Sequence, residues 1–175
     1  MNFELQPTLT GELVEVRPLR REDFDELFRA ASDPLIWELH PDRERYTKEG
    51  FTRYFESGMA SGSALVVVDR KTGRIIGSSR YHDVTREKVE VGFTFLERAY
   101  WGGAYNGELK KLMLDHAFRF VKRVLLVVGE ENLRSRRAVE KIGGKLIGRE
   151  IRTMANGAVV PHVIYAVERK EVASG

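Results

Sequence analysis

The sequence predicts a mixed α/β fold, in which helices cover a sheet that is mostly antiparallel and contains one parallel crossover. Three observations predict it. Short alternating or fully apolar segments recur between residues 64 and 96, a helical period follows near residue 109, and an Asn-Gly pair separates two final strand-like segments. The expected order is β-α-α-β-β-β-α-β-α-β-β, which is not that of a doubly wound parallel sheet.

The first predicted elements are a strand and two helices. Residues 12–18 alternate apolar and polar side chains, as in a half-buried strand. Residues 21–31 carry apolar side chains at helical spacing, and the following Asp-Pro pair ends that helix. A second helix is expected from Thr47 to about Gly62. The segment between the helices, residues 35–45, is expected to be a loop.

Three strands and a hairpin follow. The expected strands are residues 64–69, 74–82 and 89–96, with a turn at residues 71–73 between the first two. Gly92 lies inside the third strand, which indicates a bulge or a close backbone approach.

The second half of the chain alternates helices and strands. Apolar side chains from Leu109 to Val121 recur at intervals of three and four, which predicts a long amphipathic helix. A central strand at residues 124–128, a helix capped by Asn132 and a closing hairpin should follow. The hairpin strands are expected at residues 145–154 and 159–168 around Asn156-Gly157.

Length and composition fit one globular domain over residues 1–175, with 42% hydrophobic and 31% charged residues. The absence of cysteine excludes disulfides, thiolate nucleophiles and Cys-ligated zinc, and we expect no metal site. No signal peptide and no membrane span is visible, so we expect a cytoplasmic protein. The 29 basic and 26 acidic residues nearly balance, and we expect neither nucleic acid nor membrane as a partner.

The most informative segment is residues 95–108, FLERAYWGGAYNGE. A predicted strand leads into a loop of small residues, and the loop opens directly into the long helix. Small residues let backbone N–H groups approach an anion closely, and the free N–H groups of a helix start favour phosphate. The segment therefore predicts a phosphate-binding loop, with a simple tight turn as the alternative.

Two phosphate motifs fit this loop less well. A P-loop requires Lys and Ser or Thr after the last glycine, whereas Gly107 is followed by Glu108 and Leu109. A Rossmann fingerprint nearly matches the spacing of Gly102, Ala104 and Gly107. However, the loop starts several residues after its strand, and too little chain follows to complete a doubly wound sheet. A dinucleotide-binding protein is the remote alternative.

The same segment resembles the pyrophosphate loop of the GNAT acetyltransferase superfamily, which reads Q/R-G-x-G-x-G/A between a strand and a long helix. Residues 101–106, WGGAYN, occupy that place and depart from the pattern at Trp101, Ala104 and Asn106. Residues 132–143 resemble the family's N-x-x-S/A-x-x-x-Y/E-K-x-G-F segment, with Gly144 in place of phenylalanine. The Tyr-Trp-Gly form is similar to the RimJ/RimL-like branch of ribosomal-protein N-acetyltransferases. The resemblance covers essentially the whole chain.

The resemblance implies that acetyl-CoA is the acetyl donor, with its pantetheine arm along the third of the three strands. That strand should splay from its neighbour near Gly92. Arg98 and Arg137 are candidates to pair with phosphates, although solvated surface positions are equally expected of them. The residues expected to bind acetyl-CoA are Phe95, Leu96, Arg98, Trp101, Gly102, Gly103, Ala104, Tyr105, Asn106, Gly107, Asn132 and Arg137.

Acetyl transfer to an amine needs a base that makes the amine neutral and an acid that protonates the departing thiolate. Glu90, in an E-x-G position of the family, is the candidate base, and His82 and His116 are rivals. We expect His116 to be a packed core residue. Ser135 and Tyr165 are candidate acids, with cap support and strand packing as their alternative roles.

These features predict an N-acetyltransferase that moves an acetyl group directly from acetyl-CoA to a primary amine, foremost a protein N-terminus. A small-molecule amine as acceptor, such as a polyamine, amino acid or antibiotic-like compound, and a non-catalytic CoA-binding module remain alternatives. Trp37 and His40 are expected to line the acceptor side. Arg43 and Arg45 are treated as exposed loop arginines, with attraction of an acidic acceptor as an alternative. The protein should be a monomer or a homodimer.

Overall fold

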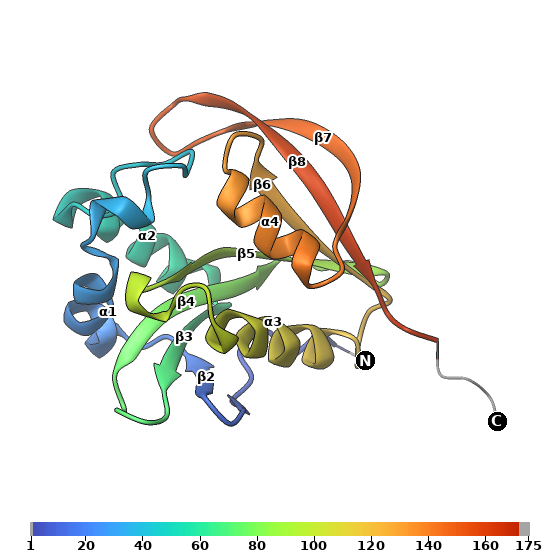
Figure 1. Cartoon of the computed structure of the whole chain (residues 1–175), viewed down its shortest axis with the longest axis horizontal. Helices are drawn as coiled ribbons and strands as arrows, with labels where there is room; N and C mark the ends of the chain where they lie inside the picture. The colour runs from blue at the N-terminus through green and yellow to red at the C-terminus, as the bar shows by residue number, and fades with distance from the viewer. Residues whose placement is uncertain (1, 172–175) are drawn as a thin grey trace.

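The fold is an eight-stranded mixed sheet with helices on both faces, seen in a computed structural model that describes residues 2–171 (Figure 1). The strand order is β1-β2-β3-β4-β5-β6-β8-β7. The strands are β1 (Leu9–Thr10), β2 (Val14–Pro18), β3 (Ala64–Asp69), β4 (Ile75–His82), β5 (Lys88–Leu96), β6 (Arg123–Gly129), β7 (Lys145–Thr153) and β8 (Val159–Glu168). The helices are α1 (Phe24–Ala31), α2 (Lys48–Ser61), α3 (Ala104–Ala117) and α4 (Leu133–Lys141).

The predicted mixed sheet is confirmed, and its elements follow the predicted order. All neighbouring strands are antiparallel except β5 and β6, which α3 joins by a parallel crossover. Two details differ from the prediction. The two-residue strand β1 is too short to show an alternating pattern, and α3 ends at Ala117, with a 3-10-like turn completing the apolar stretch to Val121.

Each face of the sheet carries its own core. On β3, Ala64 and Val66 pack against α1 and α2, whereas Leu65 and Val67 face the side of α3. Because successive strand residues point to opposite faces, a strand covered on both sides needs apolar residues at successive positions, as β3 has from Ala64 to Val68. Helices α1 and α2 therefore lie across the sheet from α3.

The predicted irregularity at Gly92 is a bulge in β5. Pairing with β4 shifts between Ser78 and Arg80, and Phe93 adopts a left-handed backbone with φ of 55°. A side chain on Gly92 would also come within 3.0 Å of the imidazole of His82. Both the bulge and the close approach are thus present, and the bulge redirects β5 where it begins to line a cavity.

Local signals fixed the helix ends. The Thr47 side chain accepts the Gly50 N–H at the start of α2, and Gly62 ends that helix with φ of 65°. No helix in residues 2–171 has the length and apolar character needed to cross a membrane.

Candidate active site

A cavity of about 590 Å³ opens where β5 and β6 separate. The two strands pair only from Lys88 to Glu90 on β5, so the rest of β5 leaves the ladder. The cavity is lined by side chains from both faces of the sheet, among them residues of the loop before α2, the start of α3 and the first turns of α4. The gap therefore connects the α1/α2 side of the sheet to the α3/α4 side.

The α3 end of the cavity suits an anion. Helix α3 begins at Gly103 without a side-chain cap and without an acidic residue in its first turn. Its first N–H groups thus have no partner within the helix, and the positive end of the helix dipole lies beside them. Gly102, with φ of 72°, makes the turn that leads the chain into the helix. A pyrophosphate group fits this helix start.

The residues expected to bind the donor divide into three groups. Those that line the cavity are Phe95, Leu96, Trp101, Gly102, Asn106 and Asn132. Those that form the helix start beside it are Gly103, Ala104, Tyr105 and Gly107, and the Tyr105 hydroxyl donates to Asp69. Arg98 and Arg137 do not line the cavity; Arg98 is paired with Asp33, and Arg137 is exposed.

Glu90 lies buried in the cavity wall between the Arg152 guanidinium and the His82 imidazole. Both of its carboxylate oxygens accept N–H groups of Arg152, at 2.8 and 3.1 Å. His82 Nε2 is 2.9 Å from Glu90 Oε2, but the approach is not aligned as a hydrogen bond. Burial acts to raise the pKa of Glu90, and these two partners outweigh it, so that its pKa lies below the ordinary value. Glu90 is therefore held as a carboxylate.

The same corner also gathers potential metal ligands. His82, Asp83 and Glu90 bring ligand atoms within 4.8 Å of one another. Both oxygens of Glu90 already accept from the Arg152 guanidinium, and a metal ion bound there would lie beside that cation. Because like charges repel, these residues fit a metal ion poorly.

The two candidate acids differ in position. Ser135 lines the cavity from the first turn of α4, whose N-cap is Asn132, and its hydroxyl forms no hydrogen bond with the described residues. Tyr165 is fully buried outside the cavity wall. Its hydroxyl donates to Glu140 at 2.7 Å and accepts from Arg136 at 3.1 Å. Ser135 is the candidate with an available hydroxyl at the cavity.

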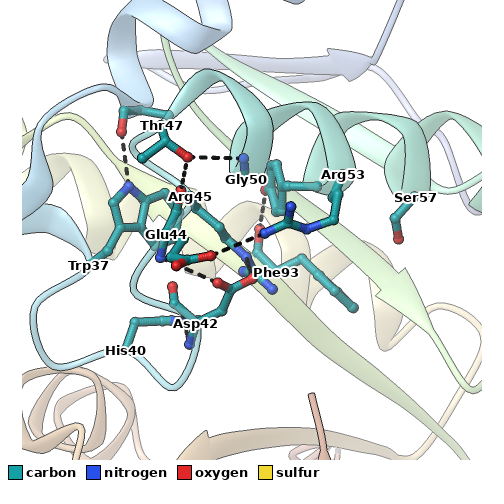
Figure 2. Close-up of polar contacts among 12 residues, drawn as sticks. Trp37, His40, Asp42, Glu44, Arg45, Thr47, Gly50, Arg53, Ser57 and Phe93 are labelled. Atoms are coloured by element: carbon teal, nitrogen blue, oxygen red, sulfur yellow. Dashed lines mark hydrogen bonds and ion pairs between the residues drawn. The ribbon is translucent and has the colours of Figure 1, made fainter. Parts of the chain in front are cut away.

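The loop before α2 forms the opposite end of the cavity. Trp37 and His40 both line it; the Trp37 indole donates to the carbonyl of Ala31 and packs edge-on to His40 (Figure 2). The Asp42 N–H donates to His40 Nδ1 at 2.9 Å, which leaves the imidazole proton on Nε2. Burial and the charge of Arg45 lower the pKa of His40 to about 3, so this ring is a neutral donor.

Comparison with known proteins identifies the family. The sequence model of the acetyltransferase (GNAT) domain matches residues 14–145. The chain belongs to the GNAT acetyltransferase family. No match was found among curated proteins.

Solved GNAT structures share the fold. A GCN5-related N-acetyltransferase from Brucella melitensis superposes with a TM-score of 0.82 at 20% identity, over 93% of this chain and 79% of that one. The ribosomal-protein-S5-alanine acetyltransferase from Vibrio fischeri gives 0.68 at 19% identity, over 93% and 96%. Mycobacterium smegmatis RimJ, in complex with CoA-disulfide, gives 0.66 at 21% identity, over 89% and 81%. At such identities the likeness shows the fold of this GNAT chain and not its acceptor.

Sequence reasoning missed much of the charge in this GNAT cavity. Arg134 lies over the Trp101 ring at 4.2 Å, and Lys110, on α3, is buried with one hydrogen bond, to Thr94 at 3.2 Å. Arg152 and Arg45 complete the set of lining Lys and Arg side chains. Burial lowers the pKa of Lys110 to about 8.

The structure confirms the expectation for His116 and contradicts the expectation for Arg45. His116 is a buried core residue, as expected, and lies among aromatic rings away from the cavity. The expectation of an exposed Arg45 was wrong. Arg45 is 7% exposed and lines the cavity, because it packs against the rings of Trp37, Tyr54 and Phe93.

Proposed function

We propose that this GNAT chain transfers an acetyl group from acetyl-CoA directly to a primary amine. One observation carries the proposal: a single cavity runs from the uncapped start of α3, through the gap between β5 and β6, to the loop before α2. A long anionic donor and an amine can thus meet from opposite sides of the sheet. With no cysteine in the chain to carry an acyl group, the transfer is direct.

The donor half of this proposal assigns the pyrophosphate to the N–H groups that follow Gly102 and Gly103. The pantetheine arm then follows the β5 backbone at Phe95 and Leu96, where β5 has left the ladder with β6 and lines the cavity. Acetyl-CoA supplies the activated acetyl group, and the chain supplies its position.

Glu90 is proposed to attract the acceptor's ammonium group and accept its proton. The carboxylate is ionised, lies in the cavity wall and is adjacent to His82, a rival for the base. Its lowered pKa makes it a weak base, so its main contribution is to accept a hydrogen bond from the amine and hold it near the donor.

Ser135 is proposed to protonate the sulfur that leaves. Its hydroxyl is unoccupied by other described residues, and the Asn132 cap orients the turn that carries it. Tyr165 is the second candidate, but its hydroxyl is already engaged by Glu140 and Arg136. We therefore expect a Ser135→Ala variant to lower kcat more than Tyr165→Phe.

The leading acceptor is a protein or peptide N-terminus, because the Tyr-Trp-Gly loop resembles the RimJ/RimL-like branch and the V. fischeri and M. smegmatis proteins share the fold. A small-molecule amine is the alternative acceptor.

A charge change at one position tests the donor site. Gly103 is the N-cap of α3, and a side chain there meets open space. Asp and Asn cap helices about equally, so Gly103→Asp and Gly103→Asn should fold alike. The aspartate alone repels pyrophosphate, and we expect it to weaken acetyl-CoA binding at least about tenfold relative to the asparagine variant.

Thermal shift with acetyl-CoA, CoA and NAD provides the readout. Stabilisation by both CoA forms in the wild type, lost in Gly103→Asp and kept in Gly103→Asn, supports the donor site. Stabilisation by NAD alone would contradict it. If the protein binds CoA but acetylates none of a panel of amines, the result would favour the alternative function of a non-catalytic CoA-binding module.

A further inference from the structure

A buried cluster of cations and aromatic rings adjoins the cavity on the α2 side of the sheet. Arg80, from β4, lies 3.7 Å from the centre of the Phe93 ring, and Arg45 lies 5.7 Å from it. Tyr54, on α2, contacts both guanidinium groups through its ring and donates its hydroxyl to the Phe93 carbonyl at 2.6 Å. The positive φ of Phe93 is thus held in place, and it positions a ring shared by two arginines.

The Arg45 guanidinium has N–H donors that form no hydrogen bond with the described residues. Its Nε donates to Asp42 at 3.1 Å, and neither Nη group has a hydrogen-bond partner among residues 2–171 (Figure 2). The side chain is nine-tenths buried and lines the cavity. A planar guanidinium with its terminal donors free is well suited to a carboxylate, which it binds through two parallel N–H···O bonds.

The cluster carries more positive than negative charge. Arg80 donates only to the Ser57 hydroxyl and, at 3.5 Å, to the Tyr54 carbonyl, and no carboxylate of the described residues pairs with it. Asp42 is therefore the sole acid set against two buried guanidinium groups. Burial and the charge of Arg45 lower the pKa of Arg80. An uncompensated buried charge is costly, and an anionic ligand would offset that cost.

The cluster is close to the expected site of transfer. The Phe93 ring packs edge-on to His82 at 5.3 Å, and His82 contacts Glu90. The cluster also lies on the α1/α2 side, across the sheet from the uncapped start of α3. The phosphates of the donor are thus assigned to the other end of the cavity, which leaves Arg45 to the acceptor.

We propose that Arg45 binds a carboxylate of the acceptor, so that the amine to be acetylated belongs to a molecule with a negative charge near its amino group. The proposal rests on the acetyltransferase function proposed above and narrows its acceptor class. Such a carboxylate has two sources: the α- or side-chain carboxylate of a free amino acid, or an acidic side chain near a peptide N-terminus.

Matched acetylated products test the proposal by binding alone. Isothermal titration of the CoA-saturated protein would compare N-acetylglycine with N-acetylglycinamide, N-acetylglutamate with N-acetylglutamine, and acetylated tripeptide amides that carry Asp or Asn at their second position. The carboxylate member of at least one pair should bind about tenfold or more tightly, because a hydrogen bond to a charged group contributes that much. The pair that discriminates identifies the source.

Variants assign the preference to Arg45. Arg45→Gln should abolish it and Arg45→Lys should retain part of it. Arg53→Gln removes an exposed arginine that pairs with Glu44 (Figure 2) and with Glu49, and it should leave the preference intact. Unfolding melts and CoA affinity report whether each variant is folded. If Arg45→Gln does not fold, the wild-type pairs and Arg45→Lys carry the test.

Three results would overturn the proposal: equal binding of the members of every pair, no measurable binding of any carboxylate member, or an unchanged preference in Arg45→Gln. Since no turnover is required, this failure is separable from failure of the proposed function. A protein that prefers carboxylates without acetylating amines refutes the transferase, whereas one that acetylates neutral and acidic amines equally refutes the role of Arg45.

Discussion

Replacing Lys110 with methionine should make the ligand-free protein more stable. Lys110 is buried, has no carboxylate partner among the described residues and donates one hydrogen bond, to Thr94. Burial lowers its pKa from 10.5 to about 8. At 1.36 kcal/mol for each pKa unit, keeping the charged lysine inside the folded protein costs about 3 kcal/mol.

The expected net gain is smaller than that cost. Methionine has a similar volume but loses the hydrogen bond to Thr94, which offsets about 1 kcal/mol. We therefore expect Lys110→Met to raise the free energy of unfolding by about 2 kcal/mol at pH 7. For a chain of this length that corresponds to an increase in Tm of about 4–8 °C. The same variant should bind acetyl-CoA more weakly, because the cavity loses a cation.

The pH dependence distinguishes this explanation from better packing. Between pH 8 and 10.5 the unfolded chain holds the Lys110 proton and the folded chain has released it, so wild-type stability rises with pH in that window. Below pH 8 the whole penalty is present. The advantage of Lys110→Met should thus be largest below pH 8 and shrink toward pH 10.

Urea unfolding followed by circular dichroism at pH 7 and pH 9.5 measures both effects. Lys111→Met is the matched control, since Lys111 is exposed and paired with Asp115, and it should change stability little at either pH. A Lys110→Met protein no more stable than wild type at pH 7, or an advantage that persists undiminished at pH 9.5, would refute the reasoning.

Three further substitutions probe the cavity and the elements that form it. Arg152→Gln removes a cation that lowers the pKa of Glu90, so burial should raise that pKa and move the acid limb of the kcat/KM profile to higher pH; a limb that stays in place would show that Glu90 is not the base. Gly50→Ala places a methyl group 2.1 Å from the Glu44 carbonyl. It should destabilise the protein by about 2 kcal/mol in a thermal melt and displace the acceptor loop with CoA affinity unchanged. Gly107→Ala, which meets open space in a helix, should instead stabilise by about 0.5–1 kcal/mol.

Features that depend only on residues adjacent in the sequence were predictable. The Thr47 cap, the left-handed Gly62 and the Asn132 cap each follow from a local preference that tertiary contacts did not override. The bulge near Gly92 was predicted for the same reason. That Phe93 and not the glycine would take the positive φ was not predictable, because it follows from the register of β5 against β4.

The burial and the pairing of the charged groups in the cavity were not predictable from the sequence. Glu90 and Arg152 are 62 positions apart in the sequence. They are in contact because the β7 segment that carries Arg152 lines the cavity between β5 and β6. A lysine in a polar position of an amphipathic helix is expected in solvent, but Lys110 faces that gap instead. Arg45 is buried by rings from three separate segments. No pattern of adjacent residues predicts these long-range contacts.

Positive charge predominates among the groups that line the cavity. The Lys, Arg, Asp and Glu side chains that line the cavity are four cations, Arg45, Lys110, Arg134 and Arg152, and one acid, Glu90. Glu90 pairs with Arg152 and Glu38 pairs with Arg134, whereas Lys110 has no carboxylate partner among the described residues and Asp42 is the sole acid beside Arg45 and Arg80. Each uncompensated cation lowers the stability of the empty protein, and an anion that enters restores it. The stability of the protein should therefore respond separately to ligands at the two ends of the cavity. CoA should offset the charges near α3 and α4, and only a carboxylate on the acceptor should offset the charge of Arg45.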